Sequence, residues 1–361
     1  MNLILVDLES EYRSILQRLG KREKSDLEGK LTEQIDAERT IIEQNIYRDK
    51  QHLAIVNFCA DKFGVGSRLS TRTGYLCVRV EPLYGLGIKT FDIAVYNRST
   101  RALILAECKS ALREARKELE DLKGKIAVTV ARRIDLENLV GDDISLLEFA
   151  LCVKAGDASL AKPIIASQGI SCCLWSADIF GETLVLERLN SDSTTEIAAG
   201  RLHRDDQLRE QLTKGSQDRR TLRTITFMPS SHMATILEEL IPQLRTELDN
   251  SQSEEFGLRD VQNLLARELS LQNFDVQEQV MLANNALNSA LETGVFVDKT
   301  KASTNPYEKR FRLSSQTHIH RRLIEDCHNK YVETHARENA LRRMVKDYRE
   351  RHPDIREYYE K

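Results

Sequence analysis

The stretch that most constrains the fold is FDIAVYNRSTRALILAECKS, residues 91–110. Two apolar runs flank the polar tetrapeptide RSTR, residues 98–101. This pattern predicts a β-hairpin with a four-residue loop. With that loop Asn97 faces Ala102, and the pairing continues outward one residue at a time. Both runs are apolar on both faces, which is typical of central strands covered by helices on each side.

Three charged residues interrupt these apolar runs, namely Asp92, Glu107 and Lys109. The predicted register puts Asp92 directly opposite Glu107, with their Cβ atoms roughly 4.5–5.5 Å apart. Lys109 follows Glu107 by two residues, so it belongs to the same face. Two carboxylates in a sparsely hydrated place repel each other unless one is protonated or a cation bridges them. Mg²⁺, for which Mn²⁺ can substitute, resolves this conflict because it prefers oxygen ligands.

The same three residues suit the hydrolysis of a phosphodiester bond. A lysine beside a metal and a phosphate can orient the attacking water, help to deprotonate it and offset developing charge. A second explanation is purely structural: Glu107 and Lys109 form a buried ion pair, and Asp92 is exposed near a strand end. That explanation leaves the facing positions of Asp92 and Glu107 unaccounted for.

The surrounding sequence predicts a central mixed sheet with flanking helices, an α/β fold. Apolar residues recur at helical spacing over residues 9–63 and stop at Gly64. A charged amphipathic helix is expected over residues 111–134. Further strands are expected in the apolar, β-rich runs, which are YLCVRVEPLYG (75–85), LLEFALCVKA (146–155), GISCCLWSAD (169–178) and ETLVLERL (182–189).

The C-terminal part has a different pattern. Three amphipathic helices followed by two short β segments are the layout of a winged helix, expected over residues 231–316. The third helix contains no Lys or Arg, so contact with DNA and contact with protein both remain open for this domain. A long charged helix is expected over residues 317–361. The predicted domains are 1–195 with the sheet and an N-terminal helical region, 196–230 as a linker, 231–316 and 317–361.

The spacing from Asp92 to the tripeptide ECK, residues 107–109, resembles the PD-(D/E)XK nuclease superfamily, which has a restriction-endonuclease-like fold. The resemblance covers about residues 35–190. It implies that Asp92, Glu107 and the backbone carbonyl of Cys108 bind the metal and that Lys109 assists the attacking water. The family often adds a Glu from the preceding helix, for which Glu38 and Glu43 are candidates and Glu43 is preferred. One departure is that Phe91 precedes the Asp where the name of the family has Pro.

DNA is the expected partner, bound through local basic patches, because the net charge of the whole chain is −3. The candidates lie in the loop before the hairpin, in the helix after it and in the predicted wing. Cutting both strands of DNA needs two active sites, so we expect a homodimer or a partner protein bound through the winged helix or the C-terminal helix. The candidate DNA-binding residues are Arg68, Arg72, Arg113, Arg116, Lys117, Lys299, Lys301, Lys309 and Arg310.

The cysteines and the apolar runs suggest where such a protein works. The seven Cys residues form no CxxC pair and lie mostly in apolar runs, which predicts reduced, buried thiols in a cytoplasmic protein. No apolar run approaches the roughly 20 residues of a membrane span, and the start of the chain does not resemble a signal peptide.

Together these features predict a metal-dependent endodeoxyribonuclease that acts in restriction, defence or mobile-element processing. A nuclease domain followed by a winged helix is also similar in architecture to the endonuclease subunit of heteromeric transposases. The alternatives are a structure-specific nuclease for Holliday junctions or repair, and a catalytically silent scaffold that binds DNA or protein.

Overall fold

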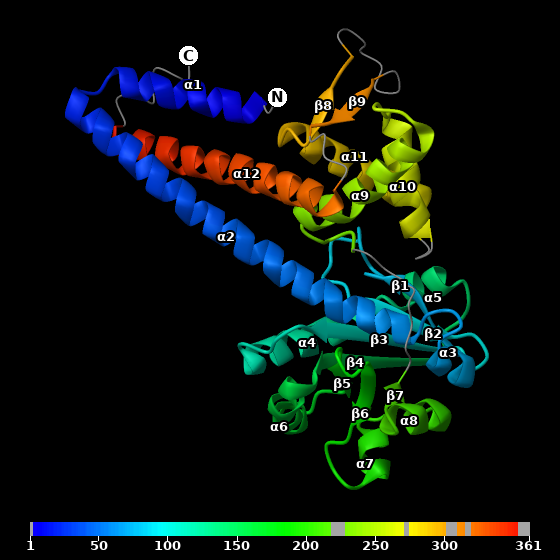
Figure 1. The fold of residues 1–361 in the computed structure, drawn as a ribbon. Coiled ribbons are helices and arrows are strands. Elements are labelled where there is room, and N and C mark those ends of the chain that lie inside the picture. Colours follow the sequence, from blue (N-terminus) through cyan, green and yellow to red (C-terminus); the bar gives the residue numbers. More distant parts are fainter. Residues whose placement is uncertain (1–2, 218–227, 271–273, 301–308, 315–318, 353–361) are drawn as a thin grey trace. The chain divides into compact units, whose positions relative to one another are not determined.

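The computed structural model describes residues 3–217, 228–270, 274–300, 309–314 and 319–352. Its contacts divide the chain into two compact units, a sheet unit and a helical unit (Figure 1). The sheet unit comprises Arg48–Ser231 and Glu268–Asp275, and the helical unit comprises Met1–Tyr47, His232–Arg267 and Val276–Lys361.

The sheet unit is built around a mixed sheet whose spatial strand order is the same as the chain order. The first three strands are antiparallel neighbours, β4 and β5 run parallel to β3, and the last two strands return antiparallel. A mixed α/β architecture was predicted, and it is confirmed. The strands are β1 (Tyr75–Val80), β2 (Ile93–Asn97), β3 (Ala102–Lys109), β4 (Leu146–Lys154), β5 (Cys173–Asp178), β6 (Thr183–Glu187) and β7 (Ser216–Gln217).

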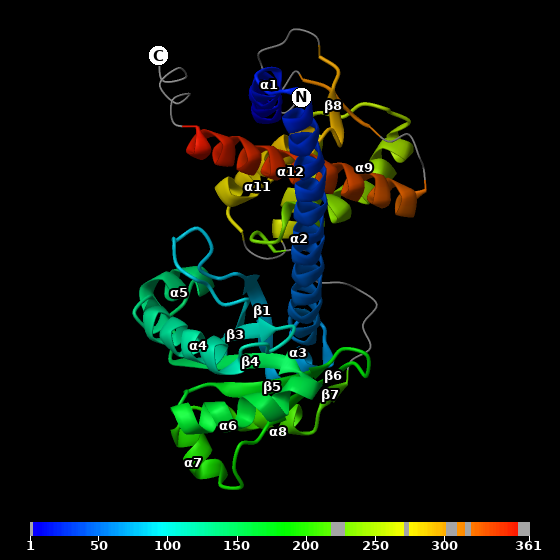
Figure 2. The ribbon, with the colours of Figure 1, turned by 90° about the vertical axis from the view of Figure 1, so that its left-hand side faces the viewer.

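Helices cover both faces of this sheet. Along β4, Leu151 and Val153 belong to the core beneath α4 and α6, whereas Cys152 contacts Cys59 of the long helix α2. Because successive strand residues point to opposite faces, α2 covers the face opposite to α4 and α6, and Figure 2 shows this arrangement. The helices of this unit are the C-terminal part of α2 (Lys21–Lys62), α3 (Arg68–Thr73), α4 (Ala115–Val130), α5 (Arg133–Val140), α6 (Ala158–Gln168), α7 (Ser193–Ala198) and α8 (Asp206–Thr213).

The helical unit contains segments from both the N-terminal and the C-terminal part of the chain. Helix α1 (Leu3–Gln17), the N-terminal part of α2 and α12 (His320–Arg351) pack around a small apolar core that includes Tyr12, Leu31 and Leu341. The long C-terminal helix was predicted and is present. It packs on α1 of its own chain.

The rest of the helical unit has three helices followed by a short β-hairpin, in the order expected for residues 231–316. The aromatic side chains of Phe256, Phe296 and Phe311 contact one another beneath the hairpin, and Phe256 forms a β-bridge with Phe311. The elements are α9 (Met233–Ser251), α10 (Leu258–Ser270), α11 (Val276–Glu292), β8 (Phe296–Asp298) and β9 (Phe311–Leu313).

Two predicted boundaries differ from the structure. Residues 1–47 group with the C-terminal helix instead of with the sheet, because the apolar faces of α1 and α2 are buried against α12. The predicted linker 196–230 contains α8 and β7, and β7 adds to the sheet by pairing with β6. In the described ranges, no helix combines the length and the apolar character that crossing a membrane requires.

Candidate active site

The β2–β3 hairpin has the predicted register. Asn97 faces Ala102 and Ile93 faces Ala106, so the four-residue loop at 98–101 is confirmed. On the even positions of β2 and the odd positions of β3, apolar side chains enter the core beneath α4 and α6. Glu107 and Lys109 continue the odd positions of β3 and therefore share that face.

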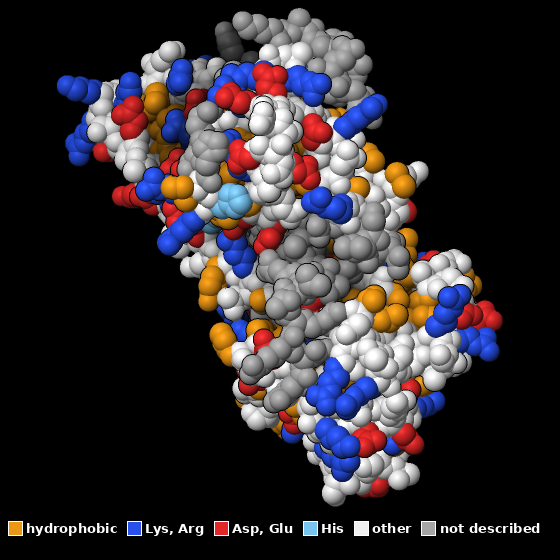
Figure 3. Space-filling model, turned by 45° about the vertical axis from the view of Figure 1, so that its right-hand side comes forward, with side chains coloured by type: hydrophobic (Ala, Val, Ile, Leu, Met, Phe, Trp, Pro, Cys, Tyr) orange, Lys and Arg blue, Asp and Glu red, His pale blue; other side chains and the backbone are white. Residues whose placement is uncertain are grey.

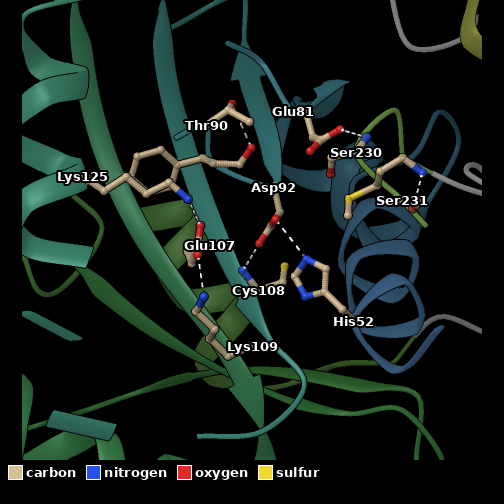
Figure 4. Close-up of polar contacts among 12 residues, drawn as sticks. His52, Glu81, Thr90, Asp92, Glu107, Cys108, Lys109, Lys125, Ser230 and Ser231 are labelled. Carbon is tan, nitrogen blue, oxygen red and sulfur yellow. Dashed lines mark hydrogen bonds and ion pairs between the residues drawn. The ribbon is translucent and has the colours of Figure 1, made fainter. Parts of the chain in front are cut away.

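Asp92 does not continue the ladder, so the predicted direct pairing with Glu107 is wrong in this detail. The chain bends at Asp92, whose own N–H donates to the Ala106 carbonyl at 3.0 Å. Its carboxylate oxygen Oδ2 accepts the Cys108 N–H at 2.6 Å (Figure 4). A buried carboxylate is stabilised by such a donor, and turning toward the Cys108 amide also moves it away from direct apposition to Glu107.

Glu107 lies between two ammonium groups. Its Oε1 is 2.8 Å from Lys109 Nζ, and its Oε2 accepts a hydrogen bond from Lys125 of α4. Lys125 also lies over the ring of Phe91, with its Nζ 4.9 Å from the ring centroid. Burial tends to lower the pKa of Lys109, but the charge of Glu107 and its hydrogen bond outweigh burial and raise that pKa. In this state Lys109 is therefore a cation and not a free base.

His52, on the C-terminal part of α2, is the second partner of Asp92. Its Nε2 is 3.1 Å from Asp92 Oδ1 (Figure 4). Burial opposes the charge on both groups, yet their attraction dominates: the pKa of His52 is raised and the pKa of Asp92 is lowered. Sequence reasoning missed His52, although its place in the buried pattern of the first predicted helix was a usable signal.

Glu81 is a third acid that the sequence did not single out. It follows β1, and its N–H donates to the Asp92 carbonyl at 2.9 Å. Its carboxylate accepts the N–H of Ser230 at 2.8 Å, and the residue is 5% exposed. Burial raises the pKa of Glu81. Its backbone has a φ of 47°, a left-handed conformation that residues other than glycine seldom adopt.

The oxygen donors of the site fit a hard divalent cation. In an extended strand, the N–H and C=O of one residue point to the same side. The Cys108 carbonyl is therefore directed toward Asp92, where β2 no longer pairs with β3. Two carboxylates and a carbonyl are ligands that Mg²⁺ and Mn²⁺ accept. A cation bound between these oxygen atoms would take the place of hydrogen-bond donors that now contact the carboxylates of Asp92 and Glu107.

The two candidates for an additional acidic ligand, Glu38 and Glu43, lie on the part of α2 that belongs to the helical unit. Glu43 is exposed on the part of α2 that belongs to the helical unit. Glu38 is 2% exposed, forms an ion pair with Arg343 of α12 at 2.8 Å and accepts from Asn339. Glu38 is therefore occupied by partners within the helical unit.

The candidate DNA-binding residues are distributed over both units. In the sheet unit, Arg116 and Lys117 form exposed ion pairs on α4, and Arg72 donates to Gln211. In the helical unit, Lys309 pairs with Asp298 at 3.6 Å. Exposed ion pairs contribute little to stability, so the basic side chains in them can leave their carboxylate partner and bind a DNA phosphate instead. On the described part of the face in Figure 3, basic and acidic side chains are interspersed and do not form one continuous basic surface.

The remaining candidates are placed as follows. Arg68 begins α3, and Arg113 is exposed just before α4. Lys299 and Arg310 flank the hairpin strands β8 and β9, and Lys301 lies outside the described residues.

Comparison of the chain with protein-family models, with curated proteins and with solved structures gave no match in any of the three.

Proposed function

We propose that the chain is a divalent-metal-dependent nuclease that hydrolyses phosphodiester bonds in DNA. The observation that carries the proposal is the set of groups at the end of the β2–β3 hairpin. Asp92, Glu107 and the Cys108 backbone meet there beside two lysines. The order of the elements supports it, because α2 is followed by the three strands β1–β3, by α4 and by β4, and the resemblance to PD-(D/E)XK nucleases implies a helix, three strands, a helix and a strand.

Each group has a defined task in this mechanism. Asp92, Glu107 and the Cys108 carbonyl would hold the cation, and His52 keeps the Asp92 carboxylate oriented. A bound Mg²⁺ or Mn²⁺ would polarise the phosphate and make the attacking water more acidic. The ammonium of Lys109, held at Glu107, donates to a phosphate oxygen and stabilises the charge that develops during attack.

The direct test is cleavage of supercoiled plasmid, single-stranded DNA and RNA by the full chain with Mg²⁺, with Mn²⁺ and with EDTA. We expect nicking or linearisation of plasmid with either metal and none with EDTA. Cleavage of RNA alone would show that the protein is a nuclease whose substrate is RNA and not DNA. Absence of cleavage on all three substrates, despite metal binding measured by calorimetry, would favour the silent-scaffold alternative.

Lys125 provides a prediction that depends on its bond to Glu107. Because its ammonium competes with an incoming cation for Glu107, we expect Lys125→Gln to bind Mn²⁺ at least about 10-fold more tightly than wild type. Two unit charges about 5 Å apart repel by a few kcal/mol at an effective dielectric of 20. Isothermal titration calorimetry measures this affinity directly.

The matched control is Lys123→Gln. Lys123 lies on the same helix but donates to the Gln168 carbonyl at 3.0 Å, so its removal should leave the Mn²⁺ affinity unchanged. Equal or weaker Mn²⁺ binding in Lys125→Gln would show that Lys125 does not compete for the metal position.

A further inference from the structure

Three cysteine thiols converge on the opposite face of the same strands. Cys59 of α2, Cys108 of β3 and Cys152 of β4 are each completely buried. Their sulfur atoms all lie within 4.8 Å of one another, and the Sγ atoms of Cys59 and Cys152 are 3.3 Å apart. Cys108 and Cys152 are direct partners across the parallel β3–β4 ladder, so the backbone fixes two of the three positions.

The spacing of these sulfur atoms fits a shared cation. In a thiolate site with metal–sulfur bonds of about 2.3 Å, tetrahedral or trigonal geometry places neighbouring sulfur atoms about 3.8–4.0 Å apart. The separation of Cys59 and Cys152 is 3.3 Å and the other two are at most 4.8 Å, so each lies within about 1 Å of that value or below it, and only small side-chain adjustments are needed. Among the described His, Cys, Asp and Glu side chains, this trio is the one group of three or more whose possible ligand atoms all lie within 4.8 Å of one another.

The donor set also determines which class of ion can bind. Sulfur ligands select soft cations such as Zn²⁺ and Cu⁺ and disfavour Mg²⁺, which prefers oxygen. Successive residues of β3 point to opposite faces of the sheet. Cys108 therefore points to the face covered by α2, whereas Glu107 and Lys109 point to the face covered by α4. The thiols and the carboxylates of Asp92 and Glu107 therefore suit different classes of ion.

We propose that Cys59, Cys108 and Cys152 form a binding site for one thiophilic cation, Zn²⁺ or Cu⁺. On binding, each thiol releases its proton to the buffer and forms one sulfur–metal bond. The cation then links α2, β3 and β4. Because α2 carries His52 and β3 carries Glu107, this bond network fixes the two elements that supply the candidate active site. The proposal does not depend on the nuclease function.

The test uses the full chain, produced in medium supplemented with a Zn²⁺ salt or with a Cu²⁺ salt that the cells reduce to Cu⁺, and purified under reducing conditions. Native mass spectrometry should find one equivalent of one of these ions, and X-ray absorption should give a shell of sulfur atoms at about 2.3 Å. Binding of Zn²⁺ alone or Cu⁺ alone would identify the ion. Finding neither ion, or a shell of only nitrogen and oxygen, would overturn the proposal.

Two variants locate the site. Cys152→Ala should weaken binding of the ion at least about 100-fold, because loss of even an indirect partner costs 10- to 100-fold. Cys172→Ala is the matched control, since Cys172 is equally buried in the same unit but lies outside the trio, and it should retain one equivalent. Full retention of the ion by Cys152→Ala would overturn the proposal. If that variant does not fold, the sulfur shell of wild type decides.

Discussion

Asp92→Asn and Glu107→Gln are each expected to reduce metal-dependent cleavage at least about 1,000-fold, measured as initial rates on supercoiled plasmid with Mg²⁺. Each substitution removes a charged oxygen ligand but keeps the size of the side chain. Metal stabilisation of transition-state charge is worth several kcal/mol, and each 1.4 kcal/mol is a factor of ten in rate. Lys109→Gln is expected to lower the rate while leaving Mg²⁺ binding in place, because Lys109 acts on the phosphate.

The control is Glu120→Gln, on the exposed face of α4, where Glu120 forms an ion pair with Arg116 and accepts a hydrogen bond from Gln168. It should cleave at the wild-type rate. Circular dichroism verifies that all variants are folded, and calorimetry separates loss of metal from loss of catalysis. Wild-type activity in Asp92→Asn would exclude this site as the active centre, whatever metal the protein binds.

The sequence predicted the backbone of the site better than its side-chain partners. The register of the hairpin followed from the length of the RSTR loop, and it holds from Asn97–Ala102 to Ile93–Ala106. Beyond the pair Ile93–Ala106, the alternation of side chains along the strands no longer predicts where Asp92 lies. Asp92 is buried, so it turns to the nearest available donor, the Cys108 amide, and leaves the ladder.

The missed partners come from segments distant in sequence. His52 precedes Asp92 by 40 residues, and Lys125 follows Glu107 by 18. The position of Lys125 depends on how α4 crosses the sheet, which hydrophobic periodicity does not specify, and several other basic residues on that helix had the same pattern. Glu81 could be associated with Asp92 only once β1 was known to be the neighbour of β2.

The domain boundary was missed for a similar reason. The helix over residues 9–63 was recognised, and the structure divides that region into α1 and α2. The apolar stripe of α1 shows that it packs against something, but a stripe does not identify its partner. Its partner, α12, lies about 300 residues later, as the ion pair between Glu9 and Arg337 shows.

The buried network around His203 gives the largest expected effect on stability. His203 is fully buried, and its Nε2 accepts the indole N–H of Trp175 at 2.9 Å. Its Nδ1 therefore carries the proton and donates to Glu148 Oε2 at 2.7 Å. Glu148 also accepts the Arg204 N–H at 2.9 Å. Burial opposes ionisation of Glu148, but the hydrogen bonds to its carboxylate outweigh burial and lower its pKa.

Glu148→Gln is expected to destabilise the sheet unit by about 2 kcal/mol at pH 7, because an amide replaces a charged acceptor and cannot reproduce both bonds. The pKa of Glu148 is lower in the folded protein than in the unfolded chain, where a Glu titrates at about 4.3. Its carboxylate therefore stabilises the fold above about pH 4.3, and this contribution is lost as the pH falls through the pKa of the folded state. The difference between wild type and Glu148→Gln should therefore shrink below about pH 4.

Trp175 is the only tryptophan of the chain, so its fluorescence during urea unfolding reports on this network specifically. The matched control is Glu210→Gln. Glu210 also has a lowered pKa, through its hydrogen bond with Lys214, but that pair is exposed on α8. Solvent screens such a pair, so the control should unfold at the wild-type urea concentration. Equal shifts in both variants, or a Glu148→Gln deficit that persists at low pH, would show that the buried carboxylate does not hold His203 and the sheet together.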